Sequence, residues 1–158
     1  MKTTVVYAIV AGILLAGAAL LWNGGSPATT AYAQSSSEPL APYMGHFQHY
    51  MHKMGLAIDA GNQPLAEFYA SKVRENMNVV EKKFPTWENL QVGALATAML
   101  GAPLKPLEDA LSKGDMAAAN GAYDTLVTGC NNCHVATQRQ FIKITRVKSN
   151  PYNQSFAR

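Results

Sequence analysis

The chain has only two cysteines among its 158 residues. They form a single C-x-x-C, and no second C-x-x-C or H-x-x-x-H supplies the further ligands that a zinc site normally needs. Strand signals are also scarce, because only residues 141–144 look extended. The strand–helix alternation typical of thiol–disulfide enzymes is therefore missing, which leaves the zinc and thiol interpretations as the weaker alternatives for this motif.

The chain also lacks the residue combinations of an enzyme that acts on its own substrate. Nothing in it resembles a paired nucleophile and base. Its glutamates at 67, 75, 81 and 88 fall where helix surfaces face solvent. The formal net charge is only +3, which is too small to indicate nucleic-acid binding. We therefore expect neither an independent catalytic activity nor a nucleic-acid partner.

Charge is almost absent from the first part of the chain, where Lys2 is the only charged residue before Glu38. An unbroken, mostly apolar run covers residues 5–22, and Ala31-Tyr32-Ala33 then offers a signal-peptidase site before Gln34. Residues 1–33 are therefore expected to be a signal peptide. The alternative is an uncleaved anchor that tethers the protein to the inner membrane, because the run at 5–22 is long enough to span a bilayer. Either way, residues 34–158 are expected in the periplasm.

The two cysteines belong to Cys130-Asn131-Asn132-Cys133-His134. C-x-x-C-H is the attachment signature of a c-type haem, in which two thiols form thioether bonds and the histidine binds iron. On a helix, positions i, i+3 and i+4 share one face, so Cys130, Cys133 and His134 can address one flat macrocycle. The sequence thus predicts one covalently bound haem c.

The rest of the mature chain has helical periodicity. Apolar residues recur at steps of three and four in segments that begin near Pro39, Pro64, Thr86 and Asp115. Gly101, Pro103 and Pro106 are expected to kink or break the third segment. The Cys130–His134 motif lies on the buried face of the fourth segment. These segments predict an all-α fold, an antiparallel four-helix bundle with haem on its last helix. The tail from 146 to 158 is expected to be either ordered coil across the bundle or a loose terminus.

A C-x-x-C-H near the C-terminus, on the last of four helices, resembles the class II c-type cytochromes, meaning cytochrome c′ and its low-spin relatives. The run Cys130–Ala136 followed by Phe141-Ile142 is similar to a set of small exported bacterial monohaem cytochromes. The same set of cytochromes also tends to have a helix break like Ala60-Gly61-Asn62 and a tail like Pro151-Tyr152-Asn153-Gln154. One departure stands out. Cytochromes c′ usually carry a basic residue four positions after the haem histidine, which here is Gln138, and Arg139 would point elsewhere on a helix.

The resemblance implies that the residue opposite His134 comes from the first helix. That segment carries three of the four histidines and several methionines. Met44, Met51 and Met54 lie on its inward stripe, whereas the histidines fall to its sides. Met51 is the first candidate for a sixth iron ligand, and the alternates are His52, His49, Met44 and Met54. The competing explanation for each methionine is that it only fills the core. For each histidine, the competing explanation is a position on the surface.

The sixth ligand separates the functions that we expect. A protein ligand predicts a periplasmic electron carrier, and an empty position predicts a five-coordinate protein that binds NO or CO. A haem subunit of a larger redox complex, at the membrane or in the periplasm, is the third possibility. The partners expected are redox proteins, and the resemblance implies a homodimer as an option.

Acidic residues are absent after Asp124, whereas the tail carries Arg139, Lys143, Arg146, Lys148 and Arg158. These basic residues predict either a solvated tail or a rim that steers an acidic partner or balances the haem propionates.

Overall fold

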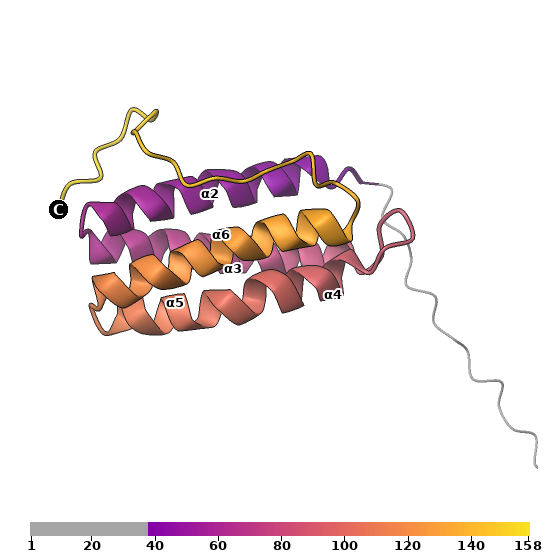
Figure 1. Ribbon diagram of the computed structural model, residues 1–158, viewed down its shortest axis with the longest axis horizontal. Coiled ribbons are helices and arrows are strands. Elements are labelled where there is room, and N and C mark those ends of the chain that lie inside the picture. Colours follow the sequence, from indigo (N-terminus) through magenta and orange to yellow (C-terminus); the bar gives the residue numbers. More distant parts are fainter. Residues whose placement is uncertain (1–37) are drawn as a thin grey trace, which may run out of the picture. The chain divides into compact units, whose positions relative to one another are not determined.

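The computed structural model describes residues 38–158, so the expected signal peptide or anchor within 1–33 lies outside the described residues. Between 38 and 158 the regular structure is helical, apart from one isolated β-bridge. None of the helices in this part of the chain is long and apolar enough to cross a membrane. The helices form a bundle, as Figure 1 shows.

The first two helices are α2, Ala41–Asp59, and α3, Gln63–Lys83. Each has a proline in its first turn, where the missing N–H costs no helical hydrogen bond. Between them Gly61 takes a positive φ of 65°, and the Asn62 side chain caps α3 by accepting a hydrogen bond from the Leu65 N–H at 3.3 Å. Both helices agree with the segments expected near Pro39 and Pro64.

The third helix differs from expectation at its start. The expected N-cap at Thr86 is wrong, because α4 (Val92–Ala96) begins only after a tight loop. In that loop Trp87 and Leu90 exchange two backbone hydrogen bonds of 2.9 Å. Glu88 and Asn89 have positive φ values there, which no helix allows.

The glycine and prolines at 101–106 do not break the third helix. It continues from α4 through a π-helical turn, η1 (Thr97–Gly101), into α5 (Ala102–Ser112). Pro103 has no N–H for the carbonyl four residues earlier, that of Met99, and a π-helical turn at this place accommodates the loss. α4, η1 and α5 thus count as one long helix, and the described part of the chain has four.

The last helix, α6, covers Met116–Ala136. The expected N-cap is confirmed, because Asp115 Oδ1 accepts a hydrogen bond from the Ala118 N–H at 2.9 Å. Its buried face carries Ala119, Tyr123, Leu126 and Cys130, at the helical steps that the sequence indicated. The prediction that both cysteines of the motif lie on the buried face of this helix is confirmed for Cys130, whereas Cys133 is half-buried.

Two close contacts set how α6 lies in the bundle. Gly55 of α2 leaves room for the ring of Tyr123, whose hydroxyl donates a hydrogen bond of 2.9 Å to the Met51 carbonyl. Gly129 lets α6 approach η1, since a Cβ atom there would lie 2.1 Å from the Met99 carbonyl oxygen. Large side chains fill the interior between the helices, among them Met54, Val73, Leu104, Leu107, Leu111 and Leu126.

The C-terminal tail is ordered coil that runs along the bundle beside α2 (Figure 1), the first of the two alternatives. The guanidinium of Arg146 forms ion pairs with Asp59 and with Asp124. Near the end Phe156 is buried, and its carbonyl accepts a hydrogen bond of 3.2 Å from Asn62 Nδ2. The extended look of residues 141–144 does not correspond to a strand. Of the five basic residues of the tail, Arg139 and Arg146 form ion pairs, whereas Lys143, Lys148 and Arg158 are exposed.

We predict that Gly129→Ala destabilises the protein, because the new methyl group collides with backbone rather than with a movable side chain. Overpacking of this kind costs about 1–3 kcal/mol. The matched control is Gly121→Ala in the same helix, where the added Cβ meets nothing within 4 Å and should stabilise by up to about 1 kcal/mol. Denaturant unfolding measures both. Equal stabilities of the two variants would show that α6 does not approach η1 this closely.

Candidate functional site

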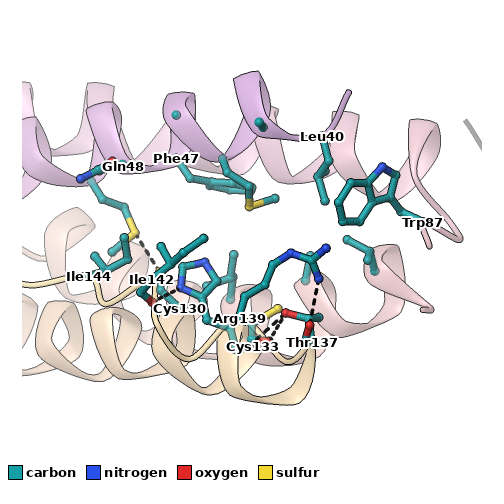
Figure 2. Close-up of a pocket in the computed structure, with 18 of the residues that line it drawn as sticks. Leu40, Phe47, Gln48, Trp87, Cys130, Cys133, Thr137, Arg139, Ile142 and Ile144 are labelled. Carbon is teal, nitrogen blue, oxygen red and sulfur yellow. Dashed lines mark hydrogen bonds between the residues drawn. The ribbon is translucent and has the colours of Figure 1, made fainter. Parts of the chain in front are cut away.

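A pocket of about 460 Å³ lies between the first half of α2, the loop around Trp87, α4 with η1, and the end of α6. In Figure 2, Leu40 and Trp87 lie at one end of it and Gln48 and Ile144 at the other. Its volume is in the range of small-molecule and cofactor sites, which are concave and mostly apolar. Apolar side chains of these elements and of the segment after α6 line it, among them Leu40, Phe47, Trp87, Val92, Leu100 and Ile144.

The three residues of the motif all line this pocket. Cys130 is buried and Cys133 is half-buried, and both are free thiols. Together with His134 they occupy the last two turns of α6, where the i, i+3, i+4 spacing brings them to one wall. Thr137 completes the end of the helix, since its hydroxyl donates to the Cys133 carbonyl at 2.9 Å.

The thiols do not have the environment of a redox-active C-x-x-C. Burial raises the pKa of Cys130 to about 12, with a smaller contribution from the neighbouring Cys133, and burial also raises the pKa of Cys133. Reactive cysteines instead have lowered pKa values, often at a helix N-terminus. Cys133 lies in the last turn of α6, at the negative end of the helix dipole. Both thiols therefore stay protonated at neutral pH.

The zinc alternative has no support in residues 38–158. No group of three or more His, Cys, Asp and Glu side chains in that range could hold a bare metal ion. The four-ligand cage of a structural zinc site is thus not formed by the described residues.

The imidazole of His134 is held by the chain that follows α6. Its Nδ1 lies 2.8 Å from the carbonyl oxygen of Ile142. Because a carbonyl can only accept, this contact requires a proton on Nδ1 and leaves the lone pair on Nε2. Metal-bound histidines almost always donate their second ring N–H in this way. In the neutral imidazole, Nε2 of His134 is therefore left with a lone pair that can act as a ligand.

The pocket separates the candidates for a sixth ligand. Met51 and Met44 line it, whereas Met54, His49 and His52 do not. Met51 is 1% exposed, and its sulfur lies 3.4 Å from Cys130 Sγ. His49 instead packs edge-on against Tyr152 of the tail, with ring centroids 5.4 Å apart. Of the five, the structure brings only Met51 and Met44 into the same pocket as the motif.

Arg139 corrects one expectation drawn from the sequence. It was expected to point elsewhere on a helix, but α6 ends at Ala136 and Gln138 takes a positive φ of 59°. The chain therefore turns back, and among the residues of 38–158 that line the pocket Arg139 is the one with a permanent charge. Its guanidinium lies 4.7 Å from the centre of the Trp87 ring and forms an ion pair of 2.5 Å with Glu88.

Sequence reasoning did not anticipate the parts that Trp87, Phe47 and the Ile142 carbonyl take in the pocket. The tryptophan two residues after Pro85 was the available signal for Trp87. No sequence pattern marks a backbone carbonyl as the partner of a histidine.

Comparisons of this chain with protein-family models, with curated proteins and with solved structures found no match.

Proposed function

We propose that residues 34–158 form a periplasmic monohaem c-type cytochrome domain, an antiparallel four-helix bundle that acts in electron transfer rather than as an enzyme. One observation carries the proposal. Cys130, Cys133 and His134 line a single apolar pocket, and the Nδ1 atom of His134 already has a carbonyl partner at 2.8 Å. This donor set matches covalent haem c and does not match a redox disulfide or a zinc cage.

Each residue of the pocket has a part in this proposal. Cys130 and Cys133 would hold the macrocycle through two thioether bonds, and His134 would bind the iron through Nε2. When bound, haem supplies reversible one-electron exchange between ferric and ferrous iron. The apolar walls exclude water, which favours the less charged state of a buried cofactor. Arg139 offers positive charge at the pocket for the propionates.

Met51 is the proposed sixth ligand, with Met44 as the alternate. Both are thioethers on α2 that line the pocket, and Met51 is the more deeply buried of the two. A Met/His pair closes the iron to external ligands and raises the reduction potential, which suits an electron carrier. Its partners are then redox proteins of the periplasm or of the membrane.

A second candidate function is binding of NO or CO by a five-coordinate iron. Phe47 favours it, because this bulky apolar side chain lies on α2 between the two methionines and also lines the pocket. If Phe47 rather than a sulfur atom faces the iron, the sixth position is open to a small gas.

Haem attachment is tested by the variant with Cys130→Ala and Cys133→Ala together, produced in a periplasm that contains the haem maturation machinery. We expect the variant to lose haem staining on a denaturing gel, because both thioether bonds are removed. Asn132→Ala is the matched control, since this exposed residue of the motif carries no bond to haem. Staining that persists in the double variant, or that is absent from the wild type, would refute the proposal.

The sixth ligand is tested by Met51→Ala and Met44→Ala, measured in parallel. We expect Met51→Ala to lose the weak far-red band of sulfur-ligated ferric haem and to gain CO binding by the ferrous form. Met44→Ala should keep the wild-type spectra. Exchanged results would assign Met44 as the ligand, and a wild-type ferrous protein that is high-spin and binds CO at once would support the gas-binding function instead.

A further inference from the structure

The carbonyl that contacts His134 belongs to a segment without regular structure. Ile142 follows the end of α6 by several residues, and only one backbone hydrogen bond of its own turn is formed, from the Ile142 N–H to the Arg139 carbonyl at 2.9 Å. A carbonyl on an irregular segment keeps a fixed place only where other contacts hold that segment. What holds residues 142–144 therefore decides how His134 is oriented.

Asn131 provides that contact. Its Nδ2 donates to the Ile144 carbonyl at 2.9 Å, and its Oδ1 accepts from the Ile144 N–H at 2.8 Å. The same Nδ2 also lies 3.2 Å from the Val127 carbonyl, one turn back on α6. One side chain thus satisfies both backbone groups of Ile144, and the backbone N–H, which can only donate, fixes which end of the amide is oxygen.

The two hydrogen bonds between Asn131 and Ile144 form a clamp. Each residue of this clamp is close in the sequence to one residue of the contact between His134 and Ile142. Asn131 is three residues before His134 on α6, and Ile144 is two residues after Ile142. In Figure 2, Ile142 and Ile144 lie at the end of the pocket where Cys130 is found. The pair of bonds from Asn131 therefore ties the segment to the same two turns of helix that carry the motif.

We propose that Asn131 is a positioning residue for His134 and thereby sets the reduction potential of the haem. By holding Ile144, it keeps the Ile142 carbonyl against Nδ1 of the imidazole. This inference rests on the proposed function, since it concerns the tuning of that same site. It also distinguishes the two asparagines of the motif, because Asn132 is exposed and takes no part in the clamp.

The direction of the effect follows from the hydrogen bond. An N–H of a ligating imidazole that donates to a carbonyl makes the ligand more basic, and a more basic ligand stabilises ferric over ferrous iron. Loss of the clamp weakens that bond and should raise the reduction potential. We expect a change of at least about threefold in the reduction equilibrium constant, which is about 28 mV for a one-electron couple.

The test uses the full mature protein with Asn131→Ala and Asn131→Leu, the second of which keeps the side-chain volume. Asn132→Ala and Asn132→Leu are the matched controls. Redox titration measures the potential, and amide hydrogen exchange at Ile144 reports on the clamp itself. Both Asn131 variants should raise the potential and speed exchange at Ile144, whereas the Asn132 variants should change neither. In the wild type, nitrogen NMR should show a proton on Nδ1 of His134 that is protected from exchange with solvent.

Three outcomes would overturn the inference. One is a potential that stays at the wild-type value although Ile144 exchanges faster, which would make Asn131 a structural clamp only. Another is an equal shift in the Asn131 and Asn132 variants. The third is an Nδ1 proton of His134 that exchanges freely with solvent in the wild type. This outcome can be measured even if no variant folds. A wild type without covalent haem would refute the proposed function itself, and this inference with it.

Discussion

The site depends on the close packing of α6 against the backbone of η1. Gly129 makes this contact one residue before Cys130, so the position of the whole motif is fixed relative to the π-helical turn. Toward the start of α6, Tyr123 and Leu126 fill the interior between the helices. Toward its end, the space beside α2 remains open and forms the apolar pocket. The first part of α6 therefore packs into the core, and its last part presents the two thiols to the pocket.

Helix positions and the buried face of α6 could be predicted from the sequence, because they depend on local periodicity and on caps such as Asp115. The start of the third helix could not. Thr86 has the chemistry of an N-cap, but positive φ values at Glu88 and Asn89 turn the chain before a helix can form. Arg139 escaped prediction for a related reason, since its direction depends on the positive φ of Gln138.

At the site, sequence reasoning located the residues of the motif better than the groups that surround them. The spacing of Cys130, Cys133 and His134 puts them on one face of a helix, and they line one pocket. The candidates on α2 could not be ranked by periodicity alone, because a small rotation of the helix exchanges them. The pocket retains Met51 and Met44 and leaves out His49, His52 and Met54. The carbonyl partner of His134 comes from tertiary structure, which no local pattern encodes.

The central claim is that this pocket holds a haem bound through both thiols of the motif. Mass spectrometry of a proteolytic peptide that contains Cys130–His134, taken from protein produced in the periplasm, tests it most directly. Haem bound through both thiols predicts a peptide heavier by one haem, with neither cysteine open to alkylation. An unmodified peptide in which both thiols are alkylated would contradict it.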